Sequence, residues 1–192
     1  MHPRVTQRIG EARFYYAYGR QRANAQWRLR HAKVGQQATI VGRPTVEATD
    51  LTIGDHFKIW SGYRRTLISG WGKIRIGDRV FINSGVVLFS VLEVSVGDDV
   101  AIANEAYITD TDSHGVAGRP ARSEPIRIGD GTWIGARAIV LPGVSIGSRC
   151  VVAAGAVVSR SMPADSLIAG NPARVVRELD YPPNIVRAWH DG

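Results

Sequence analysis

The sequence feature that most constrains the fold is a six-residue repeat in the second half of the chain. Across residues 128–158 an aliphatic side chain recurs at every sixth position: Ile128, Ile134, Val140, Ile146, Val152 and Val158. Four places after the first five of these stand small or β-branched residues: Thr132, Ala138, Val144, Cys150 and Ala156. Neither an α-helix nor a two-faced strand has this period. The repeat predicts a parallel β-helix in which each hexad forms one face of a triangular coil.

Weaker traces of the repeat reach back to Val34, so most of the chain belongs to one solenoid. The triplet Ile-Gly-Asp recurs at 53–55, 76–78 and 128–130. Glycine permits a turn, and an aspartate can accept hydrogen bonds from neighbouring backbone amides, so we interpret these triplets as coil corners. The segment 109–127 breaks the repeat for about one coil.

Composition favours a cytoplasmic protein with a single domain. A chain of 192 residues with 44% hydrophobic residues is long enough for one real core. No stretch approaches the roughly eighteen apolar residues of a membrane span, and the N-terminus lacks the apolar segment of a signal peptide. The one cysteine, Cys150, rules out an internal disulfide and fits a reducing compartment. Because Cys150 occupies an inward position of its hexad, we interpret it as a core residue and not as a nucleophile.

The positive charge of the chain is concentrated in residues 1–33. This leader holds eight arginine and lysine residues against one glutamate, together with five aromatic residues, whereas the rest of the chain is balanced. One or two short helices are expected here. Three roles stay open: a cap over the open end of the solenoid, a contact with anionic lipid or a lipid-linked sugar, and nucleic-acid binding, for which no motif is present.

The expected fold is therefore an all-β parallel solenoid with additions at both ends. The leader covers residues 1–33, the repeat body covers residues 34–160, and a C-terminal extension covers residues 161–192. A short helix is expected near Ala173–Leu179, and a last helix around Asn184–Trp189, after the break at Pro182 and Pro183.

We expect the catalytic residues in the interruption at 109–127, because loops on rigid scaffolds often carry functional residues. Residues 109–115 read Thr-Asp-Thr-Asp-Ser-His-Gly. A neutral imidazole at His114 can accept a hydroxyl proton near pH 7, and Asp110 or Asp112 is close enough in sequence to orient it. From spacing alone, a surface histidine and a general base both remain possible.

The sequence lacks the motifs of several other enzyme classes. The sequence has no Gly-x-Ser-x-Gly elbow, P-loop or dinucleotide fingerprint. Its histidines are too scattered for a zinc site within one chain, although a threefold assembly brings ligands of several chains together; they are His2, His31, His56, His114 and His190.

Residues 34–177 resemble the hexapeptide-repeat acyltransferases, in particular the branch of galactoside, maltose, nodulation and polysaccharide O-acetyltransferases. The resemblance is carried by Asp-Thr-Asp-Ser-His at 110–114, by the repeat over 125–163, and by Ala-Gly-Asn-Pro-Ala-Arg at 169–174. It implies a left-handed parallel β-helix, a homotrimer with active sites between subunits, and acetyl-CoA along the C-terminal coils. It also implies that His114 deprotonates the acceptor hydroxyl for direct attack on the thioester.

The resemblance further assigns binding residues. Acceptor contacts are implied for Asn83, Glu105 and Asp112, while Val91 stands where the sugar branch has an acidic contact, which argues against a simple galactoside or maltose acceptor. Coenzyme contacts are implied for Trp133, Gly135, Ala136, Ala154, Ser159, Arg160, Arg174 and Arg177. Guanidinium groups suit the phosphates of the coenzyme. Two roles are considered for the aromatic residues Trp60, Tyr63, Trp71 and Phe89: they line a wall that faces the sugar or the acyl group, or they pack in the core or an interface.

The sequence thus predicts a CoA-dependent O-acyltransferase that moves acetyl from acetyl-CoA to a saccharide hydroxyl, with no metal and no nucleic-acid partner. The acceptor is a sugar or polysaccharide precursor, and the leader allows a lipid-linked one and a peripheral membrane contact. Three alternatives remain: N-acetylation of an amino sugar, a trimeric β-helix scaffold without CoA, and a metal-dependent lyase of the same architecture.

Overall fold

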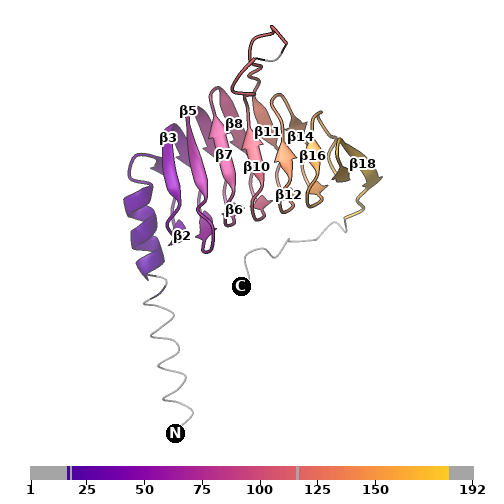
Figure 1. Cartoon of the computed structure of the whole chain (residues 1–192). Coiled ribbons are helices and arrows are strands. Elements are labelled where there is room, and N and C mark those ends of the chain that lie inside the picture. The colour runs from indigo at the N-terminus through magenta and orange to yellow at the C-terminus, as the bar shows by residue number, and fades with distance from the viewer. Residues whose placement is uncertain (1–16, 18, 116, 182–192) are drawn as a thin grey trace.

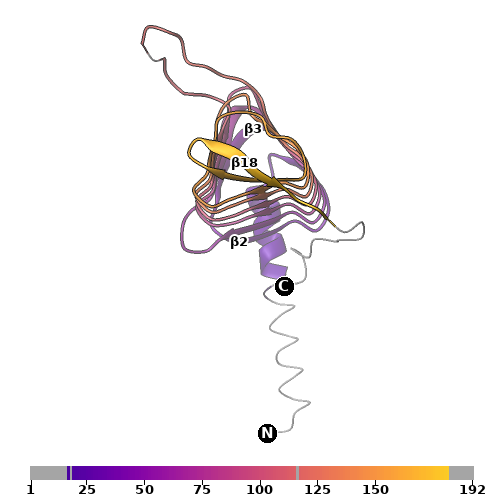
Figure 2. The same cartoon turned by 90° about the vertical axis from the view of Figure 1, so that its right-hand side faces the viewer.

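The computed structural model describes residue 17, residues 19–115 and residues 117–181. Over this part the chain is a left-handed parallel β-helix of about 7 turns, as the repeat and the resemblance predicted. The strands stack in one continuous array (Figure 1), and the view along its axis shows the triangular cross-section (Figure 2).

The prism has three faces, which we name after a strand in each. The β12 face consists of β2 (Thr39–Gly42), β4 (Lys58–Ser61), β6 (Phe81–Ile82), β9 (Ala101–Ile102), β12 (Trp133–Ile134), β15 (Val151–Val152) and β17 (Ser166–Gly170). The β10 face consists of the first halves of β3 (Thr45–Ile53) and β5 (Leu67–Ile76), then β7 (Val87–Ser90), β10 (Tyr107–Thr109), β13 (Ile139–Val140) and β16 (Val157–Val158). The β11 face consists of β1 (Lys33–Val34), the second halves of β3 and β5, then β8 (Glu93–Val96), β11 (Ile126–Ile128) and β14 (Ser145–Ile146).

The six-residue period corresponds to one face per hexad. Ile128 pairs with Ile146 on the β11 face, and Ile134 pairs with Val152 on the β12 face. All six periodic aliphatic residues and all five small residues between them are buried. Cys150 is fully buried among them, as predicted. Each fully buried aliphatic side chain contributes about 1.5–3 kcal/mol through removal from water, so the repeat is the main source of the core.

The Ile-Gly-Asp corners lie on the edge between the β11 and β12 faces, which we call the Asp edge. The Asp78 carboxylate accepts a hydrogen bond from the backbone amide of Asp55 at 2.7 Å, and Asp98 does the same for Asp78 at 2.8 Å. A Cβ at Gly54 would overlap the Asp78 carboxylate of the next coil. Glycine is therefore required here for close approach, whereas the left-handed backbone conformation falls two residues later, at His56 and Arg79.

Residues 19–28 form a helix that lies across the N-terminal end of the solenoid (Figure 1). Ala25 and Leu29 are buried against the first coil. The amide of Asn24 donates to the backbone oxygens of Ile40 at 3.0 Å and Gly42 at 2.9 Å, which satisfies acceptors at the coil end. Residues 1–16 of the leader lie outside the described residues, so the predicted membrane contact stays a prediction.

Among the residues that the structure describes, no helix is long and apolar enough to cross a membrane.

The C-terminal extension differs from the expectation. Residues 173–179 were expected to be helical, but β18 (Ala173–Glu178) is a strand that pairs antiparallel with β17. A strand satisfies the outer edge of β17 with backbone hydrogen bonds, which a helix could not do, and so closes the last coil of the β12 face. The helix expected around Asn184–Trp189 lies outside the described residues.

The outward-facing side chains distinguish the three faces. On the β10 face one registered outward row is apolar from the second coil onward: Leu67, Val87, Tyr107, Ile139 and Val157. The β12 face has a similar row: Phe81, Ala101, Trp133, Val151 and Leu167. The corresponding row of the β11 face is polar: Thr52, Arg75, Ser95, Arg127 and Ser145. Two faces are therefore suited to bury against protein, and the third to face water.

Candidate active site

The break in the repeat is an insertion at one corner and does not replace a coil. The described residues of the loop at 110–125, which are 110–115 and 117–125, leave the solenoid between β10 and β11, on the edge that we call the loop edge. They project well beyond the prism (Figures 1 and 2). The strands on both sides keep their rungs, because β10 pairs with β7 and β13 while β11 pairs with β8 and β14.

The root of the loop is a short antiparallel ladder. Thr111 and Ser123 form an isolated bridge, and the hydroxyl of Ser123 donates to that of Thr111 at 2.9 Å. The backbone amide of Asp112 donates to the oxygen of Arg122 at 2.9 Å. The two arms of the loop are thus joined at their base, and His114 lies beyond this ladder.

Asp110 is a structural residue of the loop edge. Its carboxylate is fully buried and accepts hydrogen bonds from the backbone amides of Val91, Leu92 and Glu93 at 2.7–2.8 Å. The hydroxyl of Ser90 donates to the same carboxylate at 2.8 Å. Four donors from the preceding coil therefore fix Asp110, so it cannot orient His114 as the spacing suggested.

His114 is exposed on the loop. Its Nδ1 lies 3.4 Å from the backbone oxygen of Gly115. The Asp112 carboxylate faces Arg122, with 3.7 Å between Oδ2 and Nε. In the described part of the chain, the side chain of neither aspartate proposed from the sequence contacts the imidazole.

The proposed acceptor residues Asn83 and Glu105 lie on a different edge, between the β12 and β10 faces, which we call the Asn83 edge. The side-chain oxygen of Asn83 accepts a hydrogen bond from the amide of Ser84 at 2.8 Å. The Glu105 carboxylate pairs with Arg137 at 3.0 Å and lies 3.8 Å from Arg64. Glu105 lies between Arg137 of the next coil and Arg64 of an earlier coil, so its proposed acceptor contact competes with a structural ion pair.

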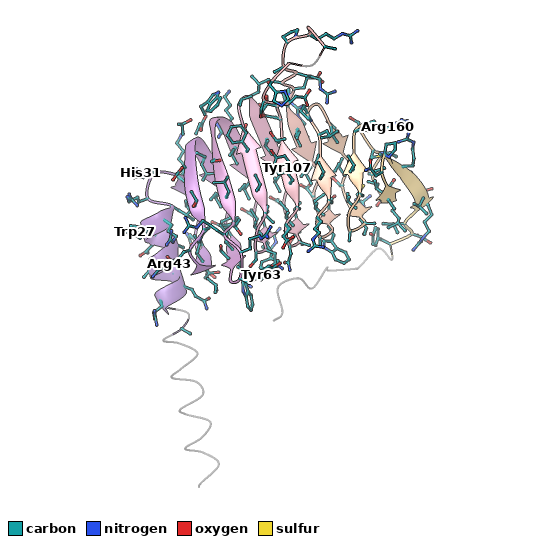
Figure 3. All side chains as sticks on the ribbon, in the orientation of Figure 1. Trp27, His31, Arg43, Tyr63, Tyr107 and Arg160 are labelled. Carbon is teal, nitrogen blue, oxygen red and sulfur yellow. The ribbon has the colours of Figure 1, made fainter. Side chains whose placement is uncertain are left out.

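Four of the eight proposed coenzyme residues follow the same edge toward the C-terminus. Trp133 lies on β12, Gly135 and Ala136 form the next corner, and Ala154 occupies the equivalent corner one coil later. Ser159 and Arg160 instead follow β16 at the loop edge, where Figure 3 shows Arg160 at the C-terminal end of the array.

Arg174 and Arg177 lie on β18 and are exposed. The guanidinium of Arg174 donates to the backbone oxygen of Ala173 at 2.7 Å. Together with Arg160 they place several positive charges at the C-terminal end of the prism, which suits the phosphates of a nucleotide.

The structure therefore separates the predicted site residues into two edges of one prism. His114 shares the loop edge with Ser159 and Arg160, two coils apart, whereas Asn83, Glu105 and the Trp133 corner share the Asn83 edge. The β10 face lies between these edges. In the described part of one chain, His114 shares its loop with the predicted acceptor residue Asp112 but lies on a different edge from Asn83 and Glu105.

Two features were not found by sequence reasoning. The first is the role of Asp110, which no local pattern signals because its donors lie about twenty residues earlier in the chain. The second is the apolar outward row on two faces. The alternation of inward and outward side chains within the hexads could have predicted this row. The aromatic candidates are partly grouped: Trp71 packs edge-to-face on Phe89, with 5.6 Å between ring centroids, one coil before the loop.

Among the described residues, no group of three His, Cys, Asp or Glu side chains is placed to hold a metal ion.

Comparison with known proteins identifies the repeat. The family model of the hexapeptide repeat of succinyl-transferase matches residues 73–110 and 125–160, on both sides of the loop. The protein Rv3034c of Mycobacterium tuberculosis, which is named as an acetyltransferase, is 34% identical over 139 residues. These residues cover 69% of this chain and 46% of Rv3034c. The protein WbbJ of Escherichia coli K12, named as a lipopolysaccharide biosynthesis O-acetyl transferase, is 32% identical over 145 residues, which cover 68% of this chain and 73% of WbbJ.

Among solved structures, the hexapeptide-repeat acetyltransferase VCA0836 of Vibrio cholerae, complexed with acetyl coenzyme A, is 30% identical. The match covers 80% of this chain and 75% of that chain, with a TM-score of 0.56. The chain spans about half the length of several curated relatives that it matches, and the M. tuberculosis protein is one of them.

Proposed function

The chain belongs to the hexapeptide-repeat acetyltransferases, and we propose that it transfers an acetyl group from acetyl-CoA to a hydroxyl of a saccharide. The observation that carries this proposal is the loop at 110–125, which spans the gap of the family match at 111–124 and presents His114 away from the solenoid. Relatives named as galactoside and polysaccharide O-acetyltransferases support a saccharide acceptor. Neighbours complexed with CoA or acetyl-CoA support the donor.

In the proposed reaction His114 acts as a general base. A proton on Nδ1 directed at the Gly115 oxygen leaves Nε2 as the free acceptor of the imidazole. Nε2 takes the proton of the acceptor hydroxyl while its oxygen attacks the thioester carbonyl. The C–O bond forms, the C–S bond breaks, and the imidazolium returns the proton to the departing CoA thiolate. General base catalysis of this kind contributes about 10²–10⁴-fold.

The coenzyme residues supply binding and position. The exposed Arg160, Arg174 and Arg177 would hold phosphates of the coenzyme at the C-terminal end, and the corners at Gly135 and Ala154 would line the path of its arm. Binding energy from this long arm fixes the thioester relative to the base, which converts a bimolecular reaction into an oriented one. A coil amide near the reacting carbonyl would stabilise the oxyanion.

We further propose that the active enzyme is a homotrimer, because His114 and Asn83 lie on different edges of one chain. In a threefold ring each interface is heterologous, so every subunit buries two different surfaces. The apolar outward rows of the β10 and β12 faces supply such a pair, and the polar β11 face would remain in water. A second subunit would then bring its own edge against the loop of the first.

The trimer can be tested with a matched pair of charges on one coil. Val87 faces outward on the β10 face and Ser95 faces outward on the β11 face. Val87→Arg should reduce the molar mass measured by light scattering, because it buries a charge at the interface, while Ser95→Arg should leave the mass unchanged. An unchanged trimer in Val87→Arg would exclude the β10 face from the interface.

The reaction itself is tested by incubating the protein with acetyl-CoA and a panel of saccharides, including lipid-linked ones. Release of the CoA thiol together with a mass increase of one acetyl group on a saccharide is the expected result. Acetylation of an amino group only would replace O-transfer by N-transfer. Failure to bind acetyl-CoA in a direct titration would overturn the proposal and favour a scaffold.

We also propose that the protein is cytoplasmic. The single cysteine, Cys150, is fully buried, which is consistent with a reducing compartment.

A further inference from the structure

The N-terminal end of the solenoid contains an open cavity whose lining is strongly basic. The cavity has a volume of about 560 Å³ and lies between the end of the 19–28 helix and the start of β3. Its lining includes Trp27, Arg28, His31, Arg43 and Arg65. Figure 3 shows Trp27, His31 and Arg43 together at this end of the molecule. A volume of this size lies within the range of small-molecule sites, about 300–1,000 Å³.

The arginines of this cavity lack the acidic partners that other arginines of the body have. Six arginines elsewhere are ion-paired with Asp or Glu within 4 Å: Arg64, Arg75, Arg79, Arg122, Arg137 and Arg149. In the described part of the chain, no such pair involves Arg28, Arg43 or Arg65. The lining contains one carboxylate, Glu47, which does not balance the charge.

The positive groups are close enough to affect one another. The pKa of Arg28 lies below the ordinary value of a guanidinium, first because burial removes water from it and then because Arg43 and Arg65 are nearby positive charges. Like charges held together without a counter-ion destabilise the empty site, and an anion between them relieves that repulsion.

Arg28 and Trp27 give the cavity a fixed wall. The Nε of Arg28 donates to Asn24 at 2.9 Å and its Nη1 donates to the Pro44 oxygen at 2.8 Å, which leaves Nη2 for a ligand. The guanidinium groups of Arg28 and Arg30 lie over the Trp27 ring, 5.2 and 5.0 Å from its centroid. A guanidinium positioned in this way has lost part of its conformational freedom before any ligand binds.

Arg43 and Arg65 come from successive coils at the same edge as Asn83. Arg43 follows β2 and Arg65 lies in the turn after β4, and these two strands pair residue by residue. Both side chains are exposed, so their guanidinium forks are accessible. The two coils thus present two forks side by side, an arrangement that suits the several oxygens of a phosphate or diphosphate.

We propose that this cavity binds a phosphate or diphosphate group through Arg28, Arg43 and Arg65. Its ligand is a phosphorylated small molecule, because the positive charge lines a concave cavity. In an extension that rests on the proposed function, the ligand is a phosphorylated saccharide acceptor that reaches along the Asn83 edge toward the coenzyme.

The test is a calorimetric titration of the full chain with inorganic pyrophosphate in the presence of saturating CoA, which occupies the other basic region. The double variant Arg43→Gln/Arg65→Gln should lower the affinity at least about tenfold, since it removes two charge-assisted contacts. Arg43→Lys/Arg65→Lys should retain part of the affinity because it keeps the charge. The matched control Lys73→Gln/Arg127→Gln removes two exposed charges from the β11 face and should bind pyrophosphate like the wild type.

Two outcomes would overturn the proposal. Pyrophosphate affinity that is unchanged in Arg43→Gln/Arg65→Gln would place the anion elsewhere. Binding to phosphatidylglycerol vesicles without binding of pyrophosphate would show that this end is a membrane surface and not a phosphate site. Neither measurement depends on acyl transfer, so failure of this proposal and failure of the proposed function give different results.

Discussion

The coils at 128–158 and the loop at 110–125 are held by different forces. In the coils the strands stack in continuous sheets, one of which ends at β14 and β16, and the inward side chains are buried. The loop is held at its root by one bridge and by the Asp110 carboxylate, and His114 beyond the root is exposed. Because the core packing does not involve the loop tip, we expect stability and chemistry to be separable by mutation.

The largest effect should come from the tip of the loop. His114→Ala should lower the rate of acetyl transfer by about 10²–10⁴-fold, because it removes the proposed general base. The melting temperature should hardly change, since the side chain is exposed and makes one weak polar contact. Thiol release from acetyl-CoA and thermal unfolding measure the two quantities.

His56→Asn is the matched control for this variant. His56 is exposed on the Asp edge and has a left-handed backbone conformation, φ 57°, which asparagine also adopts. Full activity of His56→Asn with loss in His114→Ala assigns the effect to the loop. Full activity of His114→Ala would exclude the proposed mechanism.

A change in the coils should have the opposite signature. Ile134→Ala removes buried atoms from the β12 face and should lower the free energy of unfolding by about 2–5 kcal/mol. The activity per folded molecule should be retained, because the loop root is unaffected. Urea unfolding measures the change, with Ser145→Ala on the polar β11 face as a control expected to stay within about 0.5 kcal/mol. A loss of activity in fully folded Ile134→Ala would couple the two regions.

Asp110→Asn should affect both regions, because this residue joins them. The amide cannot accept all four hydrogen bonds that the carboxylate accepts, and an unsatisfied buried donor costs about 1–3 kcal/mol. Activity should also fall, since the root that positions His114 is loosened. The control Asp130→Asn alters a carboxylate that accepts one amide, from Asp98 at 2.9 Å, and should change stability less. Equal losses in both variants would remove the special role of Asp110.

The smallest effect is expected for Arg122→Ala in the arm of the loop. Arg122 lies 3.7 Å from Asp112 and 4.0 Å from Glu124, and all three side chains are about half exposed. Such pairs contribute about 0–1 kcal/mol, so both stability and rate should change little. A rate loss as large as that of His114→Ala would place Arg122 in the reaction, and Arg127→Ala on the neighbouring strand controls for the lost charge.

The sequence predicted the coils well because their side chains repeat with the structure. Each aliphatic residue of the hexads is buried by the identical position one coil away, so period and burial have the same cause. The extension was predicted less well: Val175 and Val176 fit a helix as readily as a strand, and pairing with β17 decided between them. The role of Asp110 could not be predicted, since its partners depend on how one coil stacks on the previous one.

By itself the sequence determined the solenoid, the family and the location of the break that contains His114, because all three are written as local or periodic patterns. Only the tertiary structure decided that His114 and Asn83 lie on different edges, that Asp110 serves the corner and not the imidazole, and that Arg28, Arg43 and Arg65 share one cavity. These are relations between coils, and they follow from stacking in three dimensions, which no single stretch of sequence encodes.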